Sequence, residues 1–118
     1  MTLPLLHRGD IVLVPFPFTD LSGRKVRPAL IVSPDPVGGD ILVAFISSVI
    51  PPVPEPTEYV LDVTHPAFVQ TGLRSTSVFK MGKIATLHRS LILRRLGRTT
   101  SELQNALDIA LKRAVGLA

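Results

Sequence analysis

Short apolar runs, separated by turns rich in proline and glycine, make up most of the chain up to residue 88. The runs are rich in Val, Ile and Leu, and such runs between turn residues are typical of β-strands. We therefore predict six strands, at residues 10–16, 28–33, 41–47, 58–63, 77–81 and 83–88. Residues 17–27 are predicted to form a loop longer than a tight hairpin needs, and such loops often carry function.

The strand pattern contains two further signals. Residues 41–47 are nearly all apolar, which predicts a strand buried on both faces. Residues 65–72 are expected to hold one helical turn that Gly72 closes, and Gly82 marks a bulge or turn between the last two strands.

The C-terminal segment has the only convincing helical pattern. Either Thr99 with Glu102, or Ser101 with Gln104, can form a capping box at its start, and Gly116 ends it. One face carries apolar residues at helical spacing, namely Leu103, Leu107, Ala110, Leu111 and Ala114.

Six short strands followed by one helix predict a mainly β (α+β) fold. The simplest arrangement is a small, partly closed β-barrel with the C-terminal helix packed on it. No internal repeat or linker divides the chain, so residues 1–118 are expected to form a single domain.

The composition narrows the chemistry and the compartment. The chain has no cysteine, which excludes disulfides, thiolate metal sites and thiol catalysis and fits a reducing cytosol. No segment resembles a secretion signal, and the longest apolar run, residues 41–50, is too short to cross a bilayer as a helix. We therefore expect a cytoplasmic protein that does not associate with membranes.

The charge is distributed unevenly along the chain. Residues 1–70 contain four Lys or Arg and seven Asp or Glu, whereas residues 71–118 contain nine and two. Seven cations and no acidic residue lie between Arg74 and Arg98. Such a segment suggests a polyanionic partner.

Most familiar catalytic constellations are missing. The chain has no glycine-rich phosphate loop, no His-Glu-x-x-His motif and no Gly-x-Ser-x-Gly elbow. Its three histidines, His7, His65 and His88, are far apart and share no metal-ligand spacing. The nine carboxylates mostly lie beside turn residues, which disfavours a two-carboxylate glycosidase or a two-metal nuclease. We therefore predict no metal and no cofactor.

Arginines and hydroxyls remain as candidates for the chemistry. Arg24, Lys25 and Arg27 lie at the end of the first long loop, where they are either a solvated basic loop or a grip for phosphate. Ser47 and Ser48 end the third predicted strand, where they either cap backbone groups or donate to an anion beside Arg27.

Residues 9–18 (GDIVLVPFPF) and 26–33 (VRPALIVS) resemble the opening of the MazF/PemK family of toxins from toxin–antitoxin systems. The similarity continues in order through residues 43–48, 71–78, 83–87 and 94–97, so it covers nearly the whole chain. Each piece alone is weakly specific, but the ordered set is fairly specific.

The resemblance implies an SH3-like barrel with a C-terminal helix, usually as a homodimer. Members of this family cut single-stranded RNA at short sequences without a metal, and a cognate antitoxin neutralises them. The family's catalytic arginine matches Arg27, and its catalytic threonine matches Ser47, or Ser48 if the register slips by one. Serine keeps the hydroxyl but lacks the methyl group that restricts the threonine rotamer.

The chemistry that fits is attack of a ribose 2′-hydroxyl on the adjacent phosphorus. Arg27 would stabilise the developing charge and Ser47 would donate a hydrogen bond to the phosphate. No general base is evident, and His88 is only a weak candidate. The expected RNA contacts are Phe18, Arg24, Lys25, Pro28, Ser48, Lys83 and Arg89.

Some of these assignments have alternatives. Phe18 can instead serve the core or a dimer interface, and Arg89, Arg94 and Arg95 can instead form a solvated rim. For the whole protein, the alternative is a non-catalytic inhibitor like the related CcdB-type proteins, which share the fold and poison a gyrase. A small-barrel binding module without toxicity is a third interpretation. Arg27, Pro28 and Ser47 together favour the ribonuclease, since a pure binder would not need them.

Overall fold

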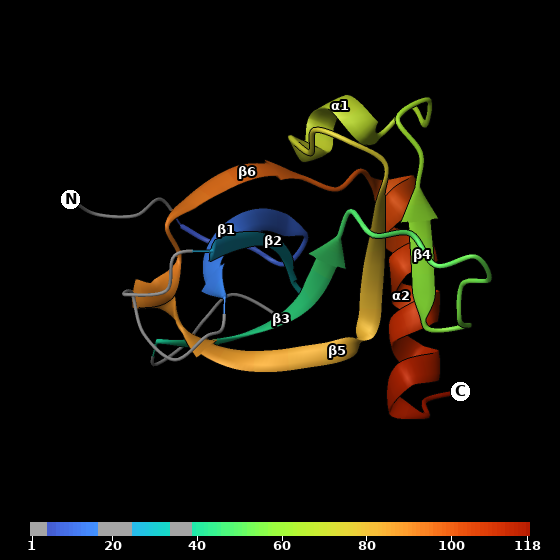
Figure 1. The fold of residues 1–118 in the computed structure, drawn as a ribbon. Helices are drawn as coiled ribbons and strands as arrows, with labels where there is room; N and C mark the ends of the chain where they lie inside the picture. The colour runs from blue at the N-terminus through green and yellow to red at the C-terminus, as the bar shows by residue number, and fades with distance from the viewer. Residues whose placement is uncertain (1–4, 17–24, 34–38) are drawn as a thin grey trace.

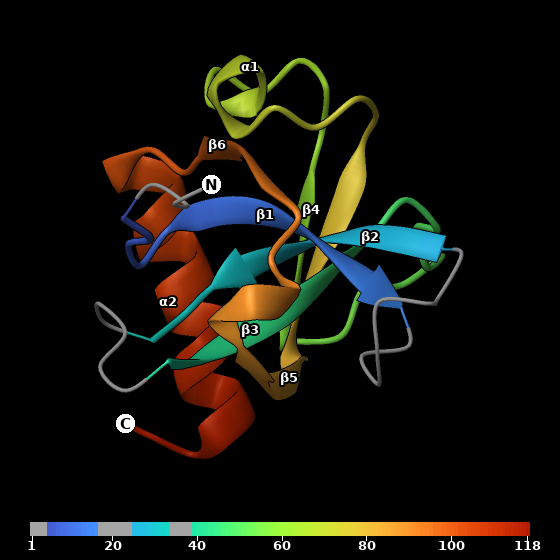
Figure 2. The same cartoon turned by 90° about the vertical axis from the view of Figure 1, so that its left-hand side faces the viewer.

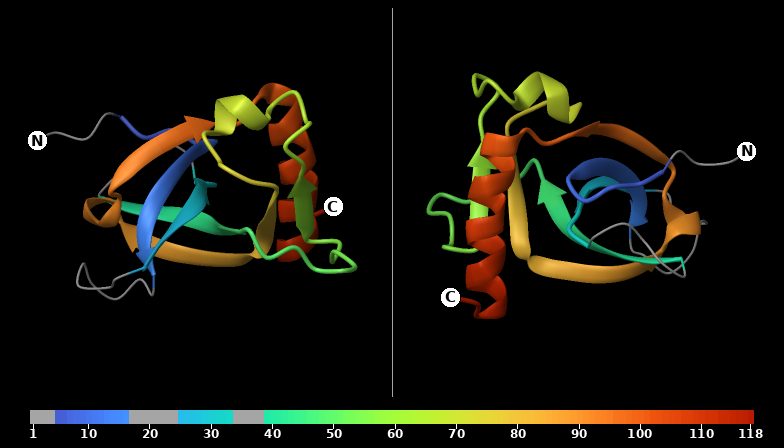
Figure 3. Two further views of the ribbon diagram at one scale, coloured as in Figure 1. Left: turned by 45° about the horizontal axis from the view of Figure 1, so that its top comes forward. Right: turned by 180° about the vertical axis from the view of Figure 1, so that it is seen from behind.

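The protein is built on one antiparallel sheet that curls into a half-barrel (Figure 1). The computed structural model describes residues 5–16, 25–33 and 39–118. Its elements are β1 (Asp10–Phe16), β2 (Lys25–Ile31), β3 (Asp40–Ser47), β4 (Glu58–Leu61), α1 (Phe68–Thr71), β5 (Ser77–His88), the 3₁₀ turn η1 (Arg89–Leu91), β6 (Arg94–Arg98) and α2 (Ser101–Val115). The strand order is β4-β5-β3-β2-β1-β6, and α2 packs outside the curl against β4 and β5 (Figure 3). The predicted mainly β fold with a C-terminal helix is therefore confirmed.

The central strands are apolar on both faces because each face has its own core. Successive side chains of a strand point to opposite faces, so Ala29 and Leu30 belong to different clusters. The outer core, under α2, contains Ile11, Leu30, Ala44, Ile46, Phe79, Met81, Leu103, Leu107 and Ala110. The inner core, inside the curl, contains Val12, Val14, Ala29, Ile31, Ile41, Val43 and Leu87. This two-sided burial explains the nearly continuous apolar run of β3, in which only Asp40 and Leu42 are exposed.

The helix α2 begins and ends close to where its sequence pattern predicts. Its N-cap is Thr100, whose hydroxyl accepts a hydrogen bond from the Leu103 amide at 3.2 Å, and Gly116 closes it at φ 74°. Both predicted capping boxes are wrong. The Thr99 hydroxyl instead donates to Gln104 Oε1 at 2.7 Å, and Ser101 is already the first helical residue.

An ion pair ties α2 to the N-terminal segment. Arg8 Nη2 lies 2.6 Å from Asp108 Oδ1, and Gln104 Nε2 donates to the same oxygen at 2.9 Å. Partial burial raises the pKa of the Asp108 carboxyl, but these hydrogen bonds outweigh it, so the pKa lies below its usual value. The charged form of Asp108 is therefore favoured in the folded protein.

Several element boundaries differ from the prediction. β2 begins at Lys25 and ends at Ile31, so residues 25–27 belong to a strand and not to the loop. Residues 77–88 form one strand, β5, because both of its halves pair with β3. The pairing shifts between Ala44 and Phe45, which leaves residues 81–83 as an insertion around Gly82. The predicted bulge at Gly82 is thus confirmed, but it interrupts the register within β5 and does not divide β5 into two strands.

The edge strand β6 was not predicted. Its sequence, RRLGR, lacks apolar alternation, and the strand forms through pairing with β1, where Leu13 lies opposite Arg94. Figure 2 shows β6 running beside β1 at the edge of the sheet. By contrast, the predicted helical turn is present as α1, which Gly72 closes at φ 74°. Neither helix in the described part of the chain has the length and apolarity needed to cross a membrane.

Candidate active site

The pairing of β2 with β3 brings the two predicted catalytic residues together. Ala29 pairs with Phe45 and Leu30 with Ala44. Continuing this antiparallel register by two residues places Arg27 opposite Ser47, and opposite residues of paired strands project on the same face. Arg27 and Ser47 accordingly line the same two cavities.

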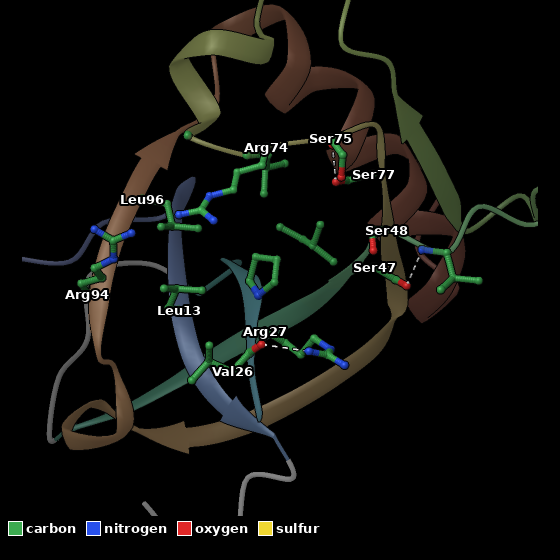
Figure 4. A pocket seen from close by; sticks show the side chains of 15 residues that line it. Leu13, Val26, Arg27, Ser47, Ser48, Arg74, Ser75, Ser77, Arg94 and Leu96 are labelled. Carbon is green, nitrogen blue, oxygen red and sulfur yellow. Dashed lines mark hydrogen bonds between the residues drawn. The ribbon is translucent and has the colours of Figure 1, made fainter. Parts of the chain in front are cut away.

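The larger cavity, which we call the main cleft, has a volume of about 530 Å³. Part of its floor is a row of residues across three strands, in which Leu13 pairs with both Pro28 and Arg94. Ser47 and Ser48 lie at one end of the cleft, where β3 ends (Figure 4). The main cleft thus spans from the ends of β2 and β3 to the edge strand β6.

Two arginines lie at the β6 end of the main cleft. Arg94 projects from β6, and Arg74 follows the C-cap of α1, which packs against β6. Figure 4 shows both guanidinium groups in the cleft, across from Arg27 and Ser47. The described residues that line the main cleft include no Asp or Glu.

The smaller cavity, which we call the side pocket, has a volume of about 320 Å³. Arg27 and Ser47 form the boundary between it and the main cleft, and Lys80 and Lys83 line its other side. As in the main cleft, the lining residues that the structure describes include no carboxylate.

Hydrogen bonds to neighbouring backbone groups hold both Arg27 and Ser47. Arg27 Nη1 donates to the Val26 carbonyl at 3.1 Å, and its guanidinium carries further N–H donors. The Ser47 hydroxyl oxygen accepts from the Val49 amide at 3.1 Å, which orients Oγ and leaves its proton to be donated. The geometry therefore suits two donors to one phosphate.

The cations of the basic segment fall into two groups. Three have carboxylate partners: Lys80 lies 3.4 Å from Glu58, and Arg95 and Arg98 lie 3.8 and 3.6 Å from the buried Asp10. The pKa of Glu58 is lowered because its carboxylate accepts from the Glu55 amide and also faces Lys80. Within the described ranges, Arg74, Lys83, Arg89 and Arg94 form no ion pair, and all but Arg89 line the two cavities.

The other predicted RNA contacts divide as follows. Pro28 and Ser48 line the main cleft and Lys83 lines the side pocket. Lys25 shares the face of Arg27 but lines neither cavity, and Arg89 lies in η1, beyond the far end of β5. Phe18 and Arg24 lie outside the described residues.

The structure does not support His88 as a general base. Its Nδ1 accepts from the Ser90 amide at 3.1 Å and lies 2.7 Å from the Ser90 hydroxyl. It pairs with Asp40 at the start of β3, whereas Ser47 ends that strand, and it lines neither cavity.

Among the residues that line the main cleft but were given no individual role from the sequence are Arg74, Ser75, Ser77 and Leu96. The first three lie in the segment TGLRSTSV, which contributed to the family resemblance only as a motif. Arg94 was singled out, but with a solvated rim as its alternative.

Within the described ranges, no group of His, Asp or Glu residues is placed to hold a metal ion. The curled sheet, the outer helix and the basic cleft define a small β-barrel protein whose candidate site lies where β2 begins and β3 ends. The chain belongs to the PemK-like, MazF-like toxin family of type II toxin–antitoxin systems, because the family model matches residues 7–115. The family predicted from the motifs is thus confirmed.

Solved structures share this fold. An endoribonuclease from a mycobacterial species, in complex with its cognate antitoxin, is 23% identical with a TM-score of 0.73, over 96% of this chain and 97% of that chain. Toxin MazF-mt6 of Mycobacterium tuberculosis is 22% identical with a TM-score of 0.71, over 92% and 98%. MazE-MazF of Deinococcus radiodurans is 18% identical with a TM-score of 0.72, over 98% and 99%. A comparison with curated proteins found no significant match.

Proposed function

We propose that this protein is an endoribonuclease toxin that cleaves single-stranded RNA at Arg27 and Ser47. The observation that carries the proposal is that both residues lie on the boundary between two cavities lined by cations and free of described carboxylates. A phosphodiester at this boundary would meet Arg27 and Ser47 as donors, while the strand continues into a cavity on either side. Single-stranded RNA suits such a site because its backbone bends and its bases are unpaired.

The reaction uses a nucleophile from the substrate. The ribose 2′-oxygen attacks the adjacent phosphorus, the P–O5′ bond breaks, and the products are a 2′,3′-cyclic phosphate and a free 5′-hydroxyl. The proton lost from the 2′-hydroxyl passes to solvent or a basic group, and one proton is delivered to O5′. Arg27 stabilises the added negative charge on the phosphoryl oxygens, a contribution worth about 3–4 kcal/mol for a well-placed donor.

The test compares wild type with Arg27→Ala and Arg27→Lys on a long RNA in excess EDTA. We expect discrete cuts with cyclic phosphate ends for wild type, and a loss of about 10²–10³-fold in rate for Arg27→Ala. Arg27→Lys should recover little, because lysine lacks the planar pair of donors. Lys112→Ala, an exposed change on α2, is the control.

Two outcomes would count against the proposal. Cleavage that Arg27→Ala leaves unchanged would place the chemistry elsewhere or in a contaminant. No cleavage, together with inhibited DNA supercoiling, would favour a CcdB-type inhibitor, which the family match does not favour.

The proposal extends to protein partners. A related endoribonuclease has been solved with its cognate antitoxin. Arg74, Lys83 and Arg94, which line the cavities without an ion pair to a described residue, suit an acidic antitoxin segment. We expect a homodimer in solution, which the mass measured by light scattering tests.

A further inference from the structure

The cations between Arg74 and Arg98 differ in whether they form an ion pair with a carboxylate of the described chain. Lys80, Arg95 and Arg98 are compensated by carboxylates of the same chain. Arg74 and Arg94 are not compensated by any described residue, and they lie at the same end of the main cleft (Figure 4). Both side chains are exposed, so their mutual repulsion is weak in water, and an anion bound between them would turn it into attraction.

The backbone around these two arginines is closely packed. A Cβ atom at Gly97 would meet the Gln70 carbonyl oxygen of α1, and a Cβ at Gly72 would meet the Leu96 carbonyl oxygen of β6. The two glycines therefore let α1 and β6 approach closely. Because Arg74 follows Gly72 by two residues and Arg94 precedes Gly97 by three, this contact sets the positions from which both arginines project.

The arrangement suits an oxyanion such as a phosphate, whose several oxygens can accept from both guanidinium groups at once. Guanidinium groups form two parallel hydrogen bonds to a phosphate, and two of them can share its oxygens. A cleft of about 530 Å³ is also large enough for a nucleotide-sized ligand. The cleft runs from the Arg74 and Arg94 end to Arg27 and Ser47 without a described carboxylate between them.

We infer that Arg74 and Arg94 form a second phosphate subsite, which binds a phosphodiester of the RNA neighbouring the one that is cut. The subsite fixes the register of the strand over Arg27 and Ser47, so both arginines are positioning residues and not catalytic ones. The identity of the ligand as RNA rests on the proposed function, whereas the anion subsite itself does not depend on cleavage.

The first test measures binding and needs no cleavage. The probe is a fluorescent single-stranded RNA with 2′-fluoro sugars at every position, which lacks the nucleophile and cannot be cut. We expect Arg74→Ala/Arg94→Ala to bind it roughly tenfold or more weakly. The slope of log Kd against log salt should fall by about 0.7, since the subsite binds one phosphodiester and each phosphate contact on a single strand contributes about 0.7.

Matched variants separate a built subsite from a general basic field. Arg74→Lys/Arg94→Lys keeps the charge, so the salt slope should stay near that of wild type while binding weakens through the loss of paired hydrogen bonds. Lys112→Ala removes a cation far from the cleft on α2 and should bind like wild type. If the alanine pair binds like Lys112→Ala, or if the lysine pair binds like wild type, the subsite is wrong. Unfolding midpoints show whether each variant is folded.

The second test locates the subsite on a cleavable RNA. Neutral methylphosphonate linkages are placed one at a time on either side of the cut. We expect one position to slow wild-type cleavage markedly while leaving the double alanine variant unaffected. If the same methylphosphonate position also slows cleavage by the double alanine variant, the inference is wrong. Wild-type protein that binds RNA but never cuts it would overturn the proposed function and leave the binding test to decide the subsite.

Discussion

The family resemblance matches Ser47 to a catalytic threonine, and this difference allows a quantitative prediction. The Val49 amide already donates to Ser47 Oγ at 3.1 Å, so the hydroxyl is partly oriented. A methyl group at Cβ would restrict χ1 further. Selecting one of three equally populated staggered rotamers costs about 0.65 kcal/mol, so the methyl group can raise the rate at most about threefold. Ser47→Thr should therefore cleave RNA between one and three times as fast as wild type.

Removing the hydroxyl has a larger effect in the opposite direction. A hydrogen bond to a charged group contributes about 1.5–3 kcal/mol, so Ser47→Ala should lower kcat/KM by about 10- to 150-fold. The assay is single-turnover cleavage of a short RNA that carries one cut site. Because Ser47 is half-buried and lines two open cavities, either change should leave the unfolding midpoint nearly unaltered.

Ser48→Ala is the control that fixes the register. Ser48 is exposed and lines the main cleft but not the side pocket, so its loss as an RNA contact should lower kcat/KM less than the loss of Ser47 does. If Ser48→Ala is slow and Ser47→Ala is not, the hydroxyl has been assigned to the wrong residue. If neither is slow, no hydroxyl from this strand end takes part, and the pairing of Arg27 with Ser47 has no catalytic meaning.

Three further predictions concern stability. Thr100→Ala should lower the free energy of unfolding by about 1 kcal/mol through loss of the N-cap, and Ser101→Ala should have little effect; denaturant titration distinguishes them. Gly97→Ala should cost about 1–3 kcal/mol because its Cβ meets backbone atoms of α1, and should also slow cleavage by displacing β6; in the same titration Gly82→Ala, where a Cβ makes ordinary contacts, should be nearly neutral. The pKa of Asp108 is lower in the folded than in the unfolded chain, so its contribution to the free energy of unfolding is present at neutral pH and lost as pH falls below about 4. Asp108→Asn should lower the free energy of unfolding by at most about 1 kcal/mol at pH 7, and this difference from wild type should vanish in acid.

The strands with apolar sequences were predictable, and the strand held by its neighbours was not. β3 carries apolar residues on both faces, so its residues alone indicate burial. Pro15 suggests an edge position for β1, which instead lies between β2 and β6. β6 has the sequence RRLGR and forms because β1 offers a free edge beside it. Lys25 to Arg27 were likewise assigned to a loop, although pairing with β1 makes them the first residues of β2. In both cases the deciding term is pairing between strands, which the local pattern does not contain.

In the candidate site, too, the local sequence could not predict which cations line the cavities. The family motifs indicate Arg27 and Ser47, but they do not tell Arg94 from Arg95, its neighbour in the sequence. Alternation along β6 and its register with β1 direct Arg94 into the main cleft, whereas Arg95 reaches the buried Asp10. That carboxylate compensates Arg98 as well, so the basic half of the chain presents fewer uncompensated charges to RNA than its composition suggests. The field that remains is concentrated where Arg74, Lys83 and Arg94 line the two cavities on either side of Arg27, which would draw a polyanion to the site of cleavage.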